Sequence, residues 1–144
     1  MMRVFFLFAA LLVAPAASAT GPCDILGEAG NPCVAAHSTV RALYRTYAGP
    51  LYNVTRPNGQ WVSIGVLEPG GFADIKKHES FCSAGDCVIS NIFDQSPQGN
   101  HLAQRISNGV VHKMVNASRH KISVGEGTEV FGMWFDPGGS CDGV

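Results

Sequence analysis

The chain has 144 residues, enough for one small domain, and its 10 basic and 11 acidic side chains leave a net charge of −1. It has no cluster of lysine and arginine that could displace counterions from phosphates, so the composition argues against nucleic acid as a partner. The 17 glycines and 8 prolines favour an all-β domain with many turns.

The first 19 residues have the pattern of a secretory signal peptide. Arg3 supplies the positive charge, residues 4–13 form an apolar run too short to span a bilayer, and Ala17-Ser18-Ala19 matches the cleavage pattern. An uncleaved membrane anchor is the alternative. We expect residues 1–19 to be removed and residues 20–144 to be secreted to an extracellular, oxidising compartment, with no membrane association after cleavage.

The segment after Cys33 has helical periodicity. Its apolar residues follow the i, i+3, i+4 spacing of one helix face, and Gly49-Pro50 then supplies a stop signal. We therefore expect one amphipathic helix near the N-terminus. Its apolar face consists of Ala36, Val40, Leu43, Tyr44 and Tyr47.

The middle of the chain predicts a β-hairpin and a short helix. Residues 51–55 and 61–66 have strand patterns, and Pro57-Asn58-Gly59 between them is a turn signal. Residues 72–81, which follow Gly70-Gly71, form the candidate helix.

After Cys87 the sequence predicts strands at residues 88–93, 110–115, 121–124 and 129–135. Short strands separated by glycine and proline turns are typical of a β-sandwich or jelly roll, so we expect a mainly β fold. The strands are too few for two closed sheets. We therefore expect an incomplete sandwich with open edges.

Five cysteines in a secreted chain indicate disulfides rather than a metal site. Cys23 and Cys33 flank a loop rich in turn-forming residues, and Cys82 and Cys87 flank four residues. These four cysteines permit three pairings. Cys141 is left over, which suggests a missing partner.

Two asparagines, Asn53 and Asn116, are candidates for N-glycosylation, and an unmodified surface asparagine is the alternative at each. Trp61 and Trp134 could stack on a sugar ring, although a tryptophan in a strand is more often a core residue. We expect no metal site, because no metal-ligand spacing relates the histidines, which are His37, His78, His101, His112 and His120.

A series of short motifs follows a fixed order along the chain: Gly21-Pro22-Cys23-Asp24-Ile25, Pro32-Cys33-Val34-Ala35-Ala36-His37-Ser38-Thr39, Arg41-Ala42-Leu43-Tyr44, Leu51-Tyr52, Gly70-Gly71-Phe72-Ala73-Asp74, Phe81-Cys82, Asp86-Cys87, Phe93-Asp94-Gln95-Ser96, Gly99-Asn100-His101-Leu102 and Phe131-Gly132-Met133-Trp134-Phe135. Together these motifs resemble the start of the catalytic domain of secreted fungal-type α-L-arabinofuranosidases, the arabinofuranosidase B family. Their number and order make the resemblance more specific than any single motif.

This resemblance implies a concanavalin-like β-sandwich and a retaining glycoside hydrolase without a cofactor. The implied substrates are terminal arabinofuranose units on arabinan and arabinoxylan side chains of plant cell walls. The resemblance also favours the pairings Cys23–Cys33 and Cys82–Cys87. In the family, the nucleophile and the acid/base carboxylates lie further along than Val144, as do the adjacent cysteines of the sugar subsite and a β-trefoil domain. We therefore assign no catalytic residue to this sequence.

Asp94 is the carboxylate with the most distinctive surroundings. It ends an apolar strand and opens the polar loop of residues 94–101. One interpretation makes it a sugar-contacting or catalytic acid, and the other makes it the anchor of a tight loop that accepts backbone N–H bonds. We favour the anchor, because the pattern of Asp94, Ser96, Gly99 and Asn100 is first of all that of a turn. A similar loop also occurs in many concanavalin-like sandwiches of diverse function, so by itself it is a weak sign of activity. The other acidic residues are scattered over loops and polar faces.

Two functional hypotheses follow. In the first, residues 20–144 are the N-terminal portion of an arabinofuranosidase B-type catalytic domain, active only as part of a longer chain. In the second, the chain is a small secreted sandwich protein that binds carbohydrate without cleaving it, or a relic of the enzyme. After Gly138 the sequence departs from the family pattern, and we expect a truncated chain.

Overall fold

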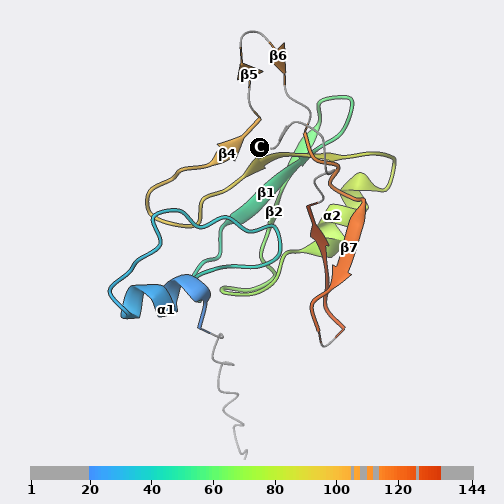
Figure 1. Ribbon diagram of the computed structural model, residues 1–144. Helices are drawn as coiled ribbons and strands as arrows, with labels where there is room; N and C mark the ends of the chain where they lie inside the picture. The colour runs from blue at the N-terminus through green and yellow to red at the C-terminus, as the bar shows by residue number, and fades with distance from the viewer. Residues whose placement is uncertain (1–19, 105, 108–109, 112–113, 126, 134–144) are drawn as a thin grey trace, which may run out of the picture.

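The computed structural model of the chain describes residues 20–104, 106–107, 110–111, 114–125 and 127–133 (Figure 1). The expected signal peptide, Trp134 and Cys141 lie outside these residues. As predicted, the described part is mainly antiparallel β-structure, accompanied by two short helices. Neither of those helices has the length and apolar character needed to cross a membrane.

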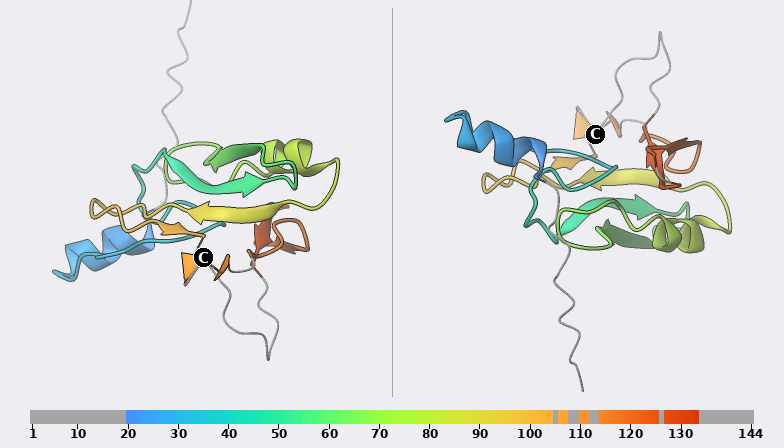
Figure 2. Two further views of the ribbon diagram at one scale, coloured as in Figure 1. Left: turned by 90° about the horizontal axis from the view of Figure 1, so that it is seen from above. Right: turned by 90° about the horizontal axis from the view of Figure 1, so that it is seen from below.

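A four-stranded antiparallel sheet forms the centre of the molecule. Its strands are β1 (Pro50–Thr55), β2 (Trp61–Gly65), β3 (Val88–Ile92) and β4 (Leu102–Ala103), in the order β2-β1-β3-β4. Figure 2 shows β1 and β3 side by side in the middle of this sheet. The predicted hairpin between β1 and β2 is confirmed. Gly59 in its loop has a φ of 83°, a left-handed value that glycine adopts without strain.

The strand register places the apolar core on one face of this sheet. Tyr52 of β1 lies opposite Ile64 of β2 and Ile92 of β3, while Val54 lies opposite Ile89. Residues directly opposite each other in antiparallel strands share a face. All five side chains are at most 1% exposed, so this face is the packed interior of the described residues.

A β-bulge in β3 keeps this apolar face continuous. Ile89 and Ile92 are three residues apart, so strict alternation would place them on opposite faces. The register instead shifts by one residue at Ser90, which is the extra residue of the bulge. The Ser90 hydroxyl accepts a hydrogen bond of 2.7 Å from the hydroxyl of Thr55 on the neighbouring strand.

The helix α2 (Ile75–Cys82) packs against the core, and it confirms the helix predicted at residues 72–81 with a later start. It begins after Asp74 because the Asp74 carboxylate accepts a hydrogen bond of 3.0 Å from the Lys77 amide. Such a cap satisfies a backbone donor that the first turn of a helix otherwise leaves without a partner.

A second hairpin, of β7 (His120–Ser123) and β8 (Glu129–Gly132), lies next to α2. The ring of Phe131 on β8 lies 4.2 Å from the ring of His78, measured between centroids. His78 is fully buried, and its Nδ1 shares a hydrogen bond of 2.9 Å with the Tyr52 hydroxyl. His78 therefore joins the sheet, α2 and β8 at one point.

The remaining strand predictions are confirmed in shortened form. β5 (Ile106–Ser107) and β6 (Val110–Val111) form a two-stranded ribbon at the start of the predicted strand 110–115. Residues 112–113 of that prediction, and residues 134–135 of the predicted last strand, lie outside the described part. The strand predicted at 121–124 corresponds to β7.

The helix near the N-terminus lies elsewhere than predicted. α1 spans Pro22–Glu28, and Pro22 in its first turn loses no hydrogen bond because it has no N–H to satisfy. The Asp24 carboxylate accepts a hydrogen bond of 2.8 Å from the Gly21 amide. Gly21 is also required for close packing, since a Cβ at this position would lie 2.2 Å from the Leu43 carbonyl oxygen.

The predicted amphipathic helix over residues 36–47 was wrong, and the segment consists of turns and extended backbone. Its backbone donors bind groups far away in the sequence. The amide of Ala36 donates to the Asp94 carboxylate at 2.7 Å, and the amide of Leu43 donates to the Gln95 side chain at 2.7 Å. These contacts override the local periodicity.

Two disulfides reinforce these connections. Cys23–Cys33 ties α1 to the loop that follows it, and Cys82–Cys87 ties the end of α2 to the start of β3. The Cα atoms of the two pairs are 5.6 and 5.7 Å apart. These separations are ordinary for disulfides.

Both disulfides can be tested on the purified protein. Mass spectrometry of non-reduced peptides should recover the Cys23–Cys33 and Cys82–Cys87 links, because each pair is adjacent in the fold. Reduction should lower the free energy of unfolding by about 2–3 kcal/mol for each bridge. A Cys33–Cys82 crosslink would contradict this pairing.

His78 should make stability depend on pH. Burial lowers its pKa to about 4, despite an opposing effect of Glu79. Between pH 6.5 and 4 the unfolded chain therefore binds more protons than the folded one, so stability falls as the pH falls. We expect urea unfolding to show a loss of about 2 kcal/mol from pH 7 to pH 4.5. In His78→Gln this loss should largely disappear, and an unchanged slope would refute the assignment.

Candidate functional site

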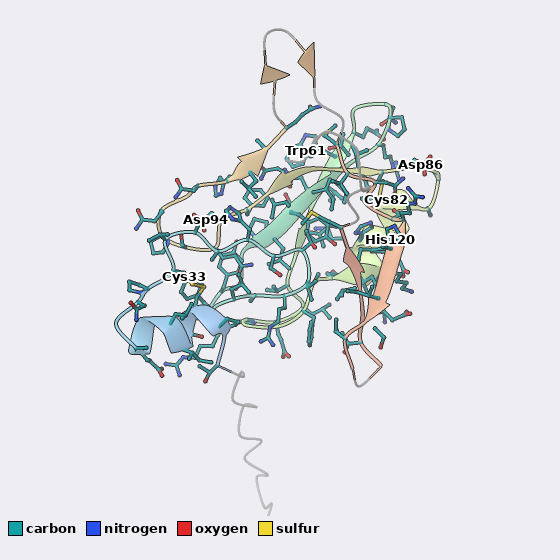
Figure 3. All side chains as sticks on the ribbon, in the orientation of Figure 1. Cys33, Trp61, Cys82, Asp86, Asp94 and His120 are labelled. Carbon is teal, nitrogen blue, oxygen red and sulfur yellow. A yellow bond between two sulfur atoms is a disulfide. The ribbon has the colours of Figure 1, made fainter. Side chains whose placement is uncertain are left out.

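The polar loop after β3, residues 94–101, is folded around the carboxylate of Asp94 (Figure 3). Asp94 is 5% exposed. Its Oδ1 accepts hydrogen bonds from the amides of Ala36 at 2.7 Å and Ser96 at 2.8 Å. Its Oδ2 accepts from the Ser96 hydroxyl at 2.8 Å and from the Asn100 amide at 2.9 Å. Both carboxylate oxygens are therefore saturated by donors of the fold.

These donors keep Asp94 ionised. Burial by itself would raise the pKa of its carboxyl group, but the hydrogen bonds from Ser96, Ala36 and Asn100 outweigh burial and hold the pKa well below its usual range. A general acid needs a proton to give at the working pH, and a nucleophile needs an accessible lone pair. Asp94 has neither, so its geometry is that of a loop anchor.

Gln95 and His101 complete the framework of this loop. The side-chain Nε2 of Gln95 donates a hydrogen bond of 3.3 Å to the Arg41 carbonyl, and its Oε1 accepts the hydrogen bond from the Leu43 backbone amide. His101 Nδ1 accepts a hydrogen bond of 3.0 Å from the Asp94 amide, so the proton of the neutral ring lies on Nε2. The motifs at residues 32–44 and 93–102, far apart in the sequence, thus form one unit.

A pocket of about 330 Å³ opens beside this unit. The sequence did not predict this pocket, because Tyr44 and Tyr47 were expected on the apolar face of a helix that does not form. Among the described residues, its wall contains no charged side chain and is lined by Tyr44, Thr46, Tyr47, Ala48, Gln95 and Pro97.

Both tyrosines of this pocket stay neutral phenols. Burial raises the pKa of Tyr44 and of Tyr47, and the negative charge of Asp94 raises each of them further. The Tyr47 hydroxyl donates a hydrogen bond of 2.5 Å to the Pro50 carbonyl. A Cβ at position 49 would lie 2.8 Å from the Tyr47 ring, so Gly49 is needed to let this ring lie across the backbone.

Five other described carboxylates have hydrogen-bond or ion-pair partners within the fold. Asp24 accepts from the Gly21 amide and, at 2.7 Å, from the Arg45 amide. Lys121 bridges Glu79 at 2.9 Å and Glu129 at 2.6 Å. Asp74 caps α2, and Asp86 accepts from the Asn116 side chain. Glu28 and Glu68 are exposed, and Glu126, Asp136 and Asp142 lie outside the described residues.

The remaining candidates from the sequence lie away from this pocket. Trp61 is 63% exposed at the opposite end of the sheet, next to Thr55.

Asn53 accepts a hydrogen bond from the Ser63 hydroxyl at 2.7 Å, and the Asn116 side chain accepts from the Ser118 amide at 3.0 Å. Glycosylation of Asn53 and Asn116 stays a prediction. Among the described residues, no group of three or more potential ligands could hold a metal ion.

Substitution of Asp94 should test its role as an anchor. Asp94→Asn keeps one oxygen but turns an amide donor toward the Ser96 hydroxyl and the Asn100 amide. We expect urea unfolding to show a loss of about 1–3 kcal/mol. Glu28→Gln makes the same chemical change at an exposed position and should alter stability by less than about 0.5 kcal/mol. Equal stability of both variants would show that Asp94 does not anchor the loop.

Comparison with known proteins places this arrangement in a family. The family described as α-L-arabinofuranosidase B, catalytic, matches residues 22–142. Probable α-L-arabinofuranosidase B of Aspergillus clavatus is 39% identical over 143 residues, which cover 94% of this chain and 28% of that protein. α-L-Arabinofuranosidase B of Emericella nidulans is 51% identical over 87 residues, which cover 60% of this chain and 17% of that protein.

Solved structures agree with the sequence comparison. A crystal structure of an arabinofuranosidase complexed with arabinofuranosyl-α-1,2-xylobiose superposes with a TM-score of 0.76 at 35% identity. The match covers 83% of this chain and 26% of that one. The chain thus spans about a quarter of the length of these relatives, at 28% and 26%. On this evidence the chain belongs to the α-L-arabinofuranosidase B catalytic-domain family.

Proposed function

We propose that this chain supplies the first part of a glycoside hydrolase domain that releases terminal arabinofuranose from arabinan or arabinoxylan side chains. The observation that carries the proposal is the family match over residues 22–142, together with the same fold in an arabinofuranosidase. That relative was solved with arabinofuranosyl-α-1,2-xylobiose, a substrate-like saccharide. The family resemblance further implies a retaining mechanism.

In this proposal the chain provides scaffold rather than the reacting groups. A retaining glycosidase needs two carboxyl groups about 5–5.5 Å apart, one of them protonated and one nucleophilic. Asp94 is saturated by the fold, and the neutral pocket beside it has no carboxylate in its wall. From the family resemblance we expect the nucleophile and the acid/base residue further along than Val144. Catalysis therefore requires a longer chain.

We also infer that the protein is secreted. The disulfides Cys23–Cys33 and Cys82–Cys87 require an oxidising compartment to persist, and the sequence of residues 1–19 has the pattern of a signal peptide. An extracellular location suits a polysaccharide substrate that cannot enter a cell.

A second candidate function is carbohydrate binding without cleavage. The uncharged pocket between Tyr44 and Pro97 favours it, since aromatic rings and hydroxyls are the usual wall of a sugar site. The two functions differ in one respect. Only the enzyme scaffold should support hydrolysis when the rest of a related catalytic domain is present.

The chain by itself should not hydrolyse arabinofuranosides. Incubation of the purified protein with 4-nitrophenyl α-L-arabinofuranoside should release no nitrophenol above the rate of the buffer, because hydrogen bonds of the fold saturate Asp94, the candidate acid. Turnover that disappears in Asp94→Asn would show that this carboxylate is catalytic after all.

A chimera tests the scaffold directly. Residues 22–133 of this chain would replace the matching segment of the Aspergillus clavatus relative, and hydrolysis of the same substrate would be measured. We expect a folded chimera with activity within about tenfold of the parent. A chimera that unfolds cooperatively but has no activity would favour the non-catalytic function.

A further inference from the structure

We propose that the pocket beside the Asp94 loop binds one neutral sugar ring, an arabinofuranosyl unit of the substrate, through a described wall that contains no carboxylate. The choice of this sugar rests on the proposed function. The existence of a binding site for a neutral, hydroxyl-rich ligand rests on the pocket itself.

The wall of the pocket is fixed before any ligand arrives. Gln95 is held by two hydrogen bonds, from its oxygen to the Leu43 amide and from its nitrogen to the Arg41 carbonyl. Tyr47 is held by its hydroxyl bond to Pro50 and packs against the core. A site that needs no ordering of its side chains loses less conformational entropy on binding, which favours a small ligand.

Two hydroxyl groups of the wall remain available. Within the part of the chain that the structure describes, the side chains of Tyr44 and Thr46 make no hydrogen bond. Burial and Asp94 both raise the pKa of Tyr44, so its phenol retains the proton and can donate as well as accept. Sugar hydroxyls offer the complementary donors and acceptors.

The charge and the volume of the pocket further restrict the class of ligand. None of the lining residues carries a charge, and the closest carboxylate, Asp94, is turned into its own loop by four hydrogen bonds. A charged ligand would therefore find no counter-ion in this pocket. A volume of about 330 Å³ is at the small end of ligand sites, which matches one ring of a saccharide rather than a long segment.

Nuclear magnetic resonance titration of the full chain tests this site. A short arabino-oligosaccharide should shift the amide signals of Thr46, Ala48 and Gln95, and xylotriose should shift them less. Tyr44→Ala should weaken binding about tenfold through loss of the ring, and Tyr44→Phe should weaken it less. The matched control is Trp61→Ala, an exposed aromatic at the other end of the sheet, which should leave the affinity unchanged.

Three results would overturn the proposal. They are no shift at tens of millimolar ligand, shifts that persist at full affinity in Tyr44→Ala, and equal weakening in Trp61→Ala. The chimera gives a second readout if the isolated chain proves unstable. There, Tyr44→Ala should raise KM for branched arabinan severalfold, whereas the control Trp61→Ala should leave it unchanged, and an unchanged KM in Tyr44→Ala would also refute the site.

The two proposals fail in different ways. A folded but inactive chimera that still binds the arabino-oligosaccharide through Tyr44 contradicts the hydrolase scaffold and supports the pocket. An active chimera without such binding contradicts the pocket and supports the scaffold.

Discussion

One buried carboxylate organises the described residues around the site. Asp94 accepts backbone hydrogen bonds from Ala36, 58 residues earlier, and from Ser96 and Asn100 in its own loop. A buried charge is stable only when donors satisfy it, so the loop and the early segment must fold together. The same interactions take residues 36–43 away from a helical path and place them against the end of β3.

This anchor also separates charge from the neutral pocket. The Asp94 oxygens face the Ser96 hydroxyl and backbone amides, and the adjacent wall formed by Tyr44, Tyr47 and Gln95 consists of uncharged side chains. In the two proposals, the pocket in this part of the domain positions a sugar, and carboxylates outside the described residues act on it. Such a division is what the proposed function requires of a segment that spans a quarter of its relatives.

Local signals in the sequence predicted the elements that depend on local interactions. The hairpin of β1 and β2, the strand β3 and the helix α2 follow from turn residues and short apolar segments close in sequence. The helix expected at residues 36–47 failed because its donors bind Asp94 and Gln95, which no periodicity can reveal. The pocket was missed for the same reason, since Tyr44 and Tyr47 meet Gln95 only in the folded chain.

The bulge at Ser90 gives β3 one residue more than its ladder with β1 requires. Without this residue the pairs Tyr52–Ile92, Asn53–Asn91 and Val54–Ile89 would follow one another by simple alternation, so Ile89 and Ile92 would stay on the apolar face. An alignment of related sequences that places a one-residue gap at Ser90 therefore keeps the interior of the protein in register. Designers who shorten this domain can trim its exposed turns, and within β3 they can delete Ser90 at the cost of its hydrogen bond with Thr55.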